Sequence, residues 1–288
     1  YQVDPKKFWK EVEQLPDFYK KNELDLVSTD TLYLNHMLTY TRAGVFKDLT
    51  NARLRKLGGQ IALYRGLPEF FVEIKQLVAT HAEYRQHDIR VEHYIVSTGL
   101  RQMILGSKIA PYVDGVWGCE FVESAPPPGY LEDVQKTISQ EPKIISQIAY
   151  ALDNTTKTRA VFEINKGSNK IPDIDVNAMI PDADRRVPFQ NMIYIADGPS
   201  DIPVFSLINR YGGRTFAVYQ PESSKEFAQV NRLQKQNRVQ SFGEANYTPS
   251  SQTAMWITNA VSEISTQIVK NRERALGEKI GKPPKHLE

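Results

Sequence analysis

The sequence predicts an α/β protein, in which a doubly wound parallel sheet follows a small helical cap domain. Short apolar runs typical of strands alternate with helical patterns from about residue 65 onward, which is the pattern of parallel β-α-β units. The segment before it contains helical patterns, and no convincing strand interrupts them. The expected parts are a cap at 1–64, a core at 65–276, and a tail with a cloning remnant at 277–288.

Three helices are expected in the cap. Asp4 is a good helix cap and Pro5 suits the first helical position, so the first helix is expected to begin there. Apolar residues then recur at intervals of three and four, as on one face of a helix. The three segments with this spacing are 4–15, 32–40 and 46–57, and Gly58-Gly59 closes the third.

Strands and helices are expected to alternate through the core. Apolar runs bounded by turn residues predict strands, and helical spacing of apolar residues predicts helices. The expected strands are 91–97, 113–122, 160–164, 192–196 and 214–219, and the expected helices are 69–77, 100–109, 130–152, 227–233 and 254–269. Residues 125–129 and 167–190 are expected to be loops, the second with a short helix, because they are rich in proline or polar residues.

The composition is that of an ordinary globular protein. Hydrophobic residues make up 41% and charged residues 24% of the 288 residues, and the net charge is +2. Such a charge does not suggest nucleic acid or an anionic membrane as a partner, and no apolar run approaches the roughly 20 residues of a spanning helix. The single cysteine, Cys119, excludes an internal disulfide and fits a reducing compartment. We therefore expect a cytoplasmic protein, whose oligomeric state the sequence does not reveal.

The expected strand at 192–196 ends in a short acidic loop. Asp197-Gly198 stops the apolar run, Asp201 follows, and apolar residues resume at Ile202 as at the start of a helix. Open α/β sheets bind ligands at the carboxyl ends of their strands, and Mg2+ prefers carboxylate oxygens as ligands. The pattern therefore predicts that Asp197 and Asp201 hold Mg2+. A plain turn, with Asp201 as the cap of the next helix, is the alternative.

Two further polar groups precede this loop in the chain. Ser97-Thr98-Gly99 and Lys166-Gly167 each follow or end an expected strand. Read in order with Asp197-Gly198 and Asp201, they resemble the second, third and fourth motifs of the haloacid dehalogenase superfamily of phosphohydrolases. The helical first segment and Arg65-Gly-Leu-Pro-Glu69 are similar to the phosphoserine phosphatase branch of that superfamily. The resemblance covers roughly residues 1–270.

The resemblance implies a Mg2+-dependent phosphatase that hydrolyses a small phosphorylated metabolite, a phosphomonoester, through an aspartyl-phosphate intermediate. Ser97 and Lys166 would be catalytic and would bind the phosphate together with the backbone N–H groups of Thr98 and Gly99. Arg53, in the cap segment 46–53, resembles the family position that meets the substrate carboxylate. The alternatives are that Ser97 caps a helix, that Lys166 is solvated, and that Arg53 is a surface helix residue.

The family's first motif, an apolar strand ending in Asp-x-Asp, has no convincing match. Asp173-Ile-Asp175 has the right letters but stands in a polar loop, and it lies after the third motif. We therefore expect the nucleophile upstream of Tyr1. A non-catalytic phosphate- or Mg2+-binding protein of the same fold is an alternative, because fold does not fix function. A phosphotransferase that uses an acceptor other than water is a third.

Overall fold

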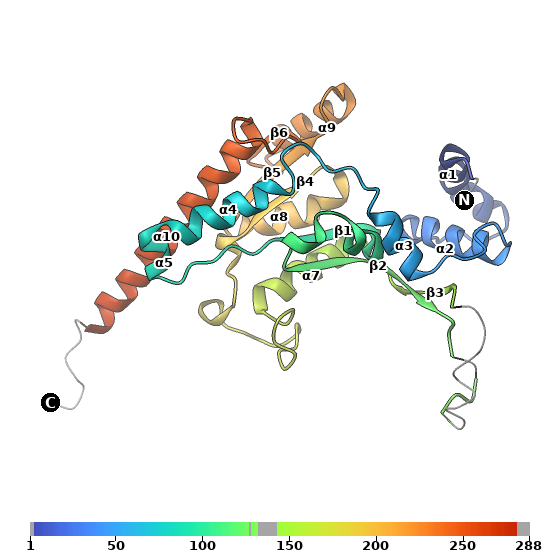
Figure 1. The fold of residues 1–288 in the computed structure, drawn as a ribbon, viewed down its shortest axis with the longest axis horizontal. Helices are drawn as coiled ribbons and strands as arrows, with labels where there is room; N and C mark the ends of the chain where they lie inside the picture. Colours follow the sequence, from blue (N-terminus) through green and yellow to red (C-terminus); the bar gives the residue numbers. More distant parts are fainter. Residues whose placement is uncertain (1–2, 127, 132–142, 281–288) are drawn as a thin grey trace. The chain divides into compact units, whose positions relative to one another are not determined.

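The computed structural model describes residues 3–126, 128–131 and 143–280 (Figure 1). The chain divides into two compact units. The first contains Tyr1–Ile61, Ile95–Ala110 and Val116–Asp153, and the second contains Ala62–Tyr94, Pro111–Gly115 and Asn154–Glu288. The helical segment expected as a separate cap therefore shares its unit with two later segments of the chain.

The helices of the first unit include the three expected from the sequence. The Asp4 side chain accepts a hydrogen bond from the backbone N–H of Lys6 at 2.9 Å and so caps the first helix. Thr50 caps the third in the same way, because its hydroxyl accepts from the N–H of Arg53 at 2.9 Å. The third helix therefore begins at Asn51 rather than at Phe46. The helices are α1 (Pro5–Lys21), α2 (Thr29–Arg42), α3 (Asn51–Gly58) and α6 (Arg101–Gly106).

Helices α3 and α6 approach each other closely. A Cβ atom added at Gly58 would stand 1.9 Å from the carbonyl oxygen of Met103, and one at Gly106 would stand 1.7 Å from that of Arg55. Real Cβ atoms essentially never come so near a backbone atom. Glycine at both positions therefore allows the two helices to pack backbone against backbone.

A three-stranded sheet packs with these helices. Its order is β1 (Tyr94–Leu100), β2 (Gly115–Glu123) and β3 (Ile145–Tyr150), and a single 3-10 turn (Ala110–Tyr112) precedes β2. Strands β2 and β3 are antiparallel. The helix expected at 130–152 is therefore wrong over 145–150, and its part at 132–142 lies outside the described residues. Apolar residues three apart, such as Ile145 and Ile148, fit a short strand as well as a helix, and here pairing with β2 decides.

The second unit is built on a parallel sheet. Its strands are β4 (Ile193–Ala196), β5 (Arg214–Tyr219) and β6 (Ser241–Glu244), paired in that order. The helices between and around them are α4 (Glu69–Thr80), α5 (Ala82–Gln86), α7 (Asn154–Lys166), α8 (Ile202–Arg210), α9 (Ser224–Lys235) and α10 (Gln252–Ile280). Alternation of parallel strands with helices confirms the α/β class. The sequence predicts one doubly wound parallel sheet, whereas the described strands form two three-stranded sheets.

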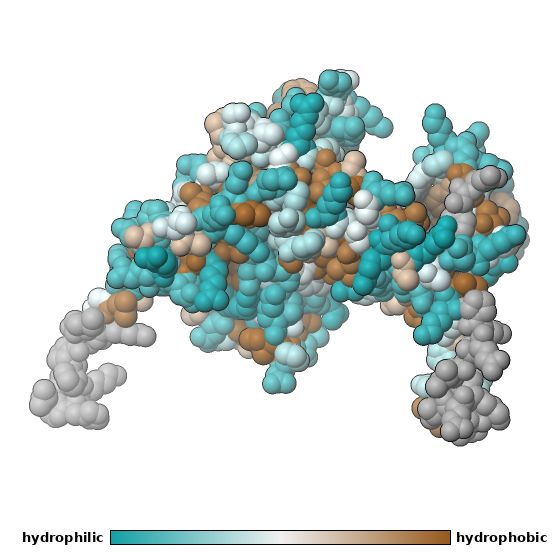
Figure 2. All heavy atoms as spheres, viewed as in Figure 1, coloured by the Kyte–Doolittle hydropathy of each residue, from teal (hydrophilic) through white to brown (hydrophobic). Residues whose placement is uncertain are grey.

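Helices cover this sheet through apolar side chains. Helix α10 packs against α4, β4 and β6, while α8 and α9 pack against β5. Phe205, Phe216 and Ile208 are completely buried in these contacts. On the face drawn in Figure 2, polar residues and small apolar areas are interspersed. No helix in the described ranges is both long and apolar enough to cross a bilayer.

One expected strand of the second unit is wrong. Residues 160–164 are not a strand but part of α7, because Lys157, Ala160, Val161 and Ile164 form one buried helical face. Helix α10 continues to Ile280, so it includes the first residues of the expected tail at 277–288. The polar stretch 167–190 is a loop with two short 3-10 turns, Asp182–Asp184 and Phe189–Asn191, as expected.

Candidate functional site

The acidic loop after β4 lies at the carboxyl end of the parallel sheet. Asp197 follows the last residue of β4, a short 3-10 turn (Pro199–Asp201) comes next, and α8 begins at Ile202. The strand and helix on either side fix both ends of this loop, since Tyr194 and Phe205 pack in one apolar cluster. The sequence prediction of a strand, an acidic loop and a helix is confirmed here.

Asp201 is buried, with 2% of its surface exposed. Its Oδ1 accepts hydrogen bonds from Nζ of Lys157 at 2.8 Å and from the hydroxyl of Tyr194 at 2.6 Å. Its Oδ2 accepts one from the hydroxyl of Ser200 at 3.2 Å. Asp201 stands at the N-cap position of α8, but its side chain makes no capping hydrogen bond to the helix, so it does not act there as the alternative interpretation required.

Lys157 comes from the first turns of α7 and is as deeply buried as its partner, with 4% exposed. Its Nζ also donates to the hydroxyl of Ser200 at 3.0 Å. A buried lysine needs such partners, because an unpaired charge inside a protein is strongly destabilising. The sequence did not single out Lys157. Its position on the apolar face of α7, at helical spacing from Ala160 and Val161, was the signal that could have found it.

Asp197 differs from Asp201 because its side chain is accessible to solvent. Partial burial and then the negative charge of Asp201 raise the pKa of the Asp197 carboxyl above its usual value, while the Lys157 charge opposes this. Gln229 of α9 donates from Nε2 to the backbone carbonyl of Asp197 at 3.1 Å. The loop is thus fastened to α9 through its backbone, and the carboxyl group remains accessible.

The carboxylates of Asp197 and Asp201 offer oxygen donors of the kind that suits a hard cation, which could bind a ligand at the same time. A cation would relieve the unfavourable negative charge that raises the Asp197 pKa. The part of the chain that the structure describes holds no group of three His, Cys, Asp or Glu side chains arranged for a metal. Mg2+ does not require one, since it is commonly bound by one or two carboxylates with water and phosphate oxygens completing the shell. Asp197 and Asp201 could supply those two carboxylates.

Lys166, the lysine that the sequence predicts to bind phosphate, contacts the loop after α7 instead of the acidic loop. It is the last residue of α7, and its Nζ donates to the backbone carbonyls of Val176 and Ala178 at 2.6 and 2.7 Å. The sequence placed it after a strand because 160–164 is an apolar run, and in the helix it stands nine residues beyond Lys157. Lys157, not Lys166, therefore contacts the acidic loop.

Ser97, Thr98 and Gly99 belong to the first unit. They lie within β1, which continues to Leu100, so Ser97 does not close the strand as expected. The hydroxyl of Ser97 accepts from the N–H of Gly99 at 3.0 Å, and the Thr98 carbonyl accepts from the hydroxyl of Tyr33 at 2.6 Å. Their phosphate-binding role remains a prediction.

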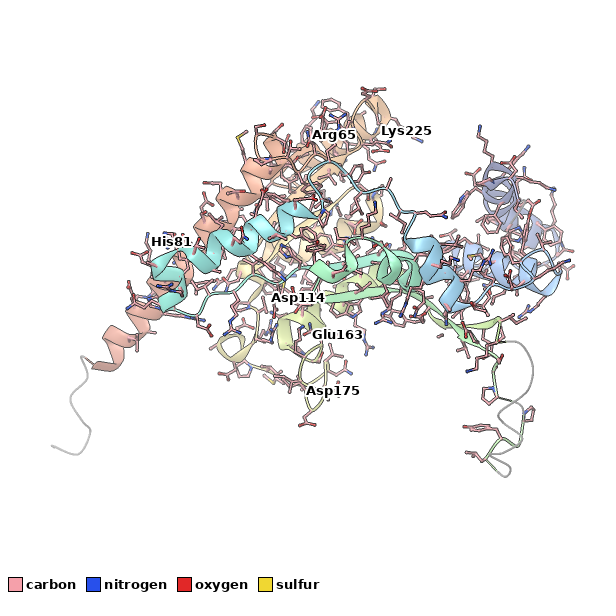
Figure 3. All side chains as sticks on the ribbon, in the orientation of Figure 1. Arg65, His81, Asp114, Glu163, Asp175 and Lys225 are labelled. Carbon is pink, nitrogen blue, oxygen red and sulfur yellow. The ribbon has the colours of Figure 1, made fainter. Side chains whose placement is uncertain are left out.

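Arg53 also belongs to the first unit, where it is exposed on α3 and forms an ion pair with Asp48 at 3.0 Å. Asp173 and Asp175 are exposed in the loop after α7, where Figure 3 labels Asp175. Asp175 accepts from the N–H of Asn177 at 2.8 Å, a local turn contact. This agrees with the interpretation of Asp173-Ile-Asp175 as a loop rather than a strand motif.

Comparison with known proteins gives a relative that is described only as uncharacterized. This protein, from Borreliella burgdorferi, is 39% identical to the chain over 264 residues, which are 91% of this chain and 88% of the relative. No family model matches the chain, and no solved structure matches it. Since the identity extends over most of both proteins, the chain belongs to the same family as the uncharacterized protein of Borreliella burgdorferi.

Proposed function

We propose that this protein is a Mg2+-dependent phosphatase acting on a small phosphomonoester. In this proposal the β4–β6 sheet and its helices belong to a doubly wound core like that of the haloacid dehalogenase superfamily. Asp197 and Asp201 supply the metal ligands, and Lys157 replaces Lys166 as the phosphate-binding lysine. The substrate itself is a metabolite whose identity the residues do not specify.

The observation that carries the proposal is the buried Lys157–Asp201 pair next to the accessible Asp197. Burying two charges costs several kcal/mol of desolvation for each ion, and an apolar pair of similar volume is often at least as stable. An ion pair kept buried at the carboxyl edge of a parallel sheet, the edge where such sheets bind ligands, favours a chemical role over a structural one.

Each residue has a defined task in this proposal. Lys157 has three N–H groups, of which two donate to Asp201 and Ser200 among the described residues, so one remains for a phosphate oxygen. Its charge would offset the charge of the phosphoryl group, which spreads over the equatorial oxygens during transfer. Asp201 holds the Lys157 side chain in place through the 2.8 Å hydrogen bond to its Nζ. A Mg2+ ion bound at Asp197 would supply further charge neutralisation at the phosphate.

A non-catalytic binding protein is the second candidate, and one observation favours it. Among the described residues, the Asp-x-Asp pairs Asp173–Asp175 and Asp182–Asp184 lie in a loop and a 3-10 turn, so neither follows a strand. A phosphate- and Mg2+-binding protein needs no nucleophile. A phosphotransferase, the third candidate, would use the same lysine and carboxylates.

The test is hydrolysis of 4-nitrophenyl phosphate by the full-length protein as Mg2+ is titrated. Asp197→Asn should lower the rate about 100-fold or more, because it removes a charged metal ligand with little change in volume. Lys166→Met serves as the comparison, since Lys166 lies on the same helix but its Nζ donates to the loop carbonyls of Val176 and Ala178; most of the activity should remain.

The outcomes separate the candidates. Binding of Mg2+ and inorganic phosphate in calorimetry without turnover would support the binding protein. Transfer of the phosphoryl group to an added alcohol in preference to water would support the phosphotransferase. An Asp197→Asn variant with the wild-type rate at limiting Mg2+ would show that the metal assignment is wrong.

A further inference from the structure

The hydroxyl of Tyr194 has a single acceptor among the described residues, Oδ1 of Asp201. Lys157 donates to the same oxygen, so Oδ1 receives two bonds of 2.6 and 2.8 Å. Oδ2 receives one longer bond of 3.2 Å, from Ser200. The two oxygens of this carboxylate are therefore held unequally, because Oδ1 receives two short hydrogen bonds and Oδ2 receives a single longer one.

The ring of Tyr194 is well placed to fix its hydroxyl. It lies on β4 in parallel register with Thr215 of β5, and it meets the ring of Phe205 edge-on at 5.5 Å between centroids. It also packs against the apolar clusters on both α8 and α9. A tyrosine ring wedged in this way has little freedom, so the hydroxyl holds one position relative to Asp201.

Packing alone does not explain a tyrosine at this position. A phenylalanine would fill the same space, whereas a buried hydroxyl is unfavourable unless it forms a hydrogen bond. A tyrosine hydroxyl carries its proton at neutral pH, and here it donates to Oδ1 of Asp201 at 2.6 Å. The group therefore has one evident use, which is to bind the Asp201 carboxylate.

We infer that Tyr194 is a positioning residue, which together with Lys157 holds Oδ1 of Asp201 so that Oδ2 is the oxygen offered to the metal–phosphate group. The inference rests on the proposed function, because it assigns a task within that site. The residue that orients the acidic loop would then lie in β4 itself, at Tyr194, three residues before Asp197.

The test is the Tyr194→Phe variant of the full chain, with 4-nitrophenyl phosphate as substrate. We expect kcat to fall about tenfold and the Mg2+ concentration for half-maximal rate to rise severalfold, because a hydrogen bond to a charged group is lost at the metal ligand. The KM for the substrate at saturating Mg2+ should change by less than about twofold.

Tyr84→Phe is the matched control. The Tyr84 hydroxyl is also buried, and it bonds to the Ser262 carbonyl at 3.2 Å and to Thr266 at 2.9 Å. This control should lower the unfolding temperature as much as Tyr194→Phe does but leave both kinetic constants unchanged. If Tyr194→Phe behaves like the control, Tyr194 is only structural and the inference is overturned.

A second variant covers the case in which Tyr194→Phe does not fold. Ser200→Ala removes the donor to Oδ2 but leaves Oδ1 fixed, so the half-saturating Mg2+ concentration should stay within about twofold. A larger change would show that Ser200, rather than Tyr194, orients the carboxylate. If the wild-type protein neither hydrolyses the substrate nor binds Mg2+ in calorimetry, the proposed function fails and this inference with it. An active wild type with an unaffected Tyr194→Phe variant overturns the inference alone.

Discussion

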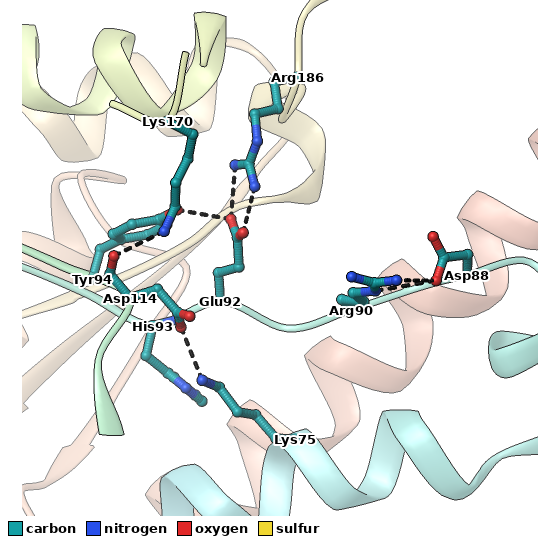
Figure 4. A network of polar contacts seen from close by, with 9 residues as sticks. All are labelled: Lys75, Asp88, Arg90, Glu92, His93, Tyr94, Asp114, Lys170 and Arg186. Carbon is teal, nitrogen blue, oxygen red and sulfur yellow. Dashed lines mark hydrogen bonds and ion pairs between the residues drawn. The ribbon is translucent and has the colours of Figure 1, made fainter. Parts of the chain in front are cut away.

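The second unit contains two networks of charged side chains that differ in burial. Lys157 and Asp201 form an ion pair that is almost completely inaccessible to solvent. The other network, drawn in Figure 4, centres on Glu92 and Asp114 and is partly open, with 25% of the Glu92 side chain and 29% of the Arg186 side chain exposed. Both networks pair carboxylates with cations, but the desolvation cost is much larger for the buried Lys157–Asp201 pair than for the partly open network.

The open network ties together segments that are far apart in the chain. Glu92 accepts from both terminal nitrogens of Arg186, in a bidentate pair, and from the hydroxyl of Tyr94 at 2.8 Å. Asp114 accepts from Nζ of Lys75 at 2.9 Å and from the N–H of His93 at 2.8 Å. Lys170 reaches the Asp114 carbonyl at 3.0 Å. These bonds attach the loop after α7 to residues 92–94 and 114, so a structural role accounts for them.

The buried pair has no such structural explanation. Lys157 and Asp201 lie on α7 and at the start of α8, two helices that already pack against each other through apolar side chains. The comparison shows that the candidate site differs from the open network in how deeply its charged side chains are buried, and not in how many charges it contains. Four predictions test this distinction, from the largest expected effect to the smallest.

The largest effect is expected when the buried pair is broken. Lys157→Met leaves the Asp201 charge buried without its cation, which should lower the free energy of unfolding by about 3–5 kcal/mol. Urea denaturation measures this. Adding Asp201→Asn to Lys157→Met removes the uncompensated charge but keeps an acceptor for Tyr194, so most of the stability should return. A single variant that unfolds at the wild-type urea concentration would contradict the assignment of a buried ion pair.

A smaller effect is expected in the open network. Glu92→Gln should lower the free energy of unfolding by about 1 kcal/mol, because solvent screens a partly exposed pair. Asp88→Asn is the control, since Asp88 and Arg90 are 77% and 79% exposed in their pair and should contribute almost nothing. A loss at Glu92 as large as that of Lys157→Met would remove the contrast between the networks.

The Glu92 contribution should also depend on pH. The Arg186 hydrogen bonds, despite opposing burial, lower the pKa of Glu92 below its usual value, so the unfolded chain binds more protons near that value than the native protein does. The stability contributed by Glu92 is therefore complete above about pH 5 and is lost as the pH falls through the lowered pKa of the folded state. Wild type and Glu92→Gln should converge in acid when urea denaturation is repeated at each pH; a constant difference would contradict this account.

The smallest effect, of opposite sign, is expected at Asp197. Burial and Asp201 raise its pKa, so its charge is destabilising above that pKa and harmless below the unfolded value. In Mg2+-free buffer at pH 7, Asp197→Asn should be more stable than wild type by about 0.5 kcal/mol or less, since the side chain is accessible and solvent screens it. The gain should vanish below about pH 4. A variant less stable than wild type at pH 7 would mean that Asp197 serves the fold.

The acidic loop could be predicted from the sequence because several local signals agree there. An apolar run, an Asp-Gly stop and a renewed apolar pattern are each informative, and together they leave one arrangement. The parallel strand β5 was predictable for the same reason, since its apolar run Phe216–Tyr219 lies between turn residues. Strand β6 was missed because Ser241–Glu244 is too short and too polar to stand out.

The lysine could not be predicted because its environment is tertiary. The run Ala160–Ile164 fits a buried strand or the buried face of a helix, and only packing against α8 decides between them. If the run is a strand, Lys166 follows its end and Lys157 is one polar residue of the preceding loop. Burial of a lysine against an aspartate 44 positions later is a long-range contact that leaves no local pattern.

The close approach of α3 and α6 has a mechanical consequence. Gly58 lies against the backbone of Met103 and Gly106 against that of Arg55, so at these two points no side chain separates the helices that could deform and absorb a displacement. Helix α6 begins directly after β1, which carries Ser97, Thr98 and Gly99. A displacement of α3, which carries Arg53, should therefore displace α6 and the end of β1 as well. Within the first unit, the predicted substrate arginine and the predicted phosphate-binding segment would move together.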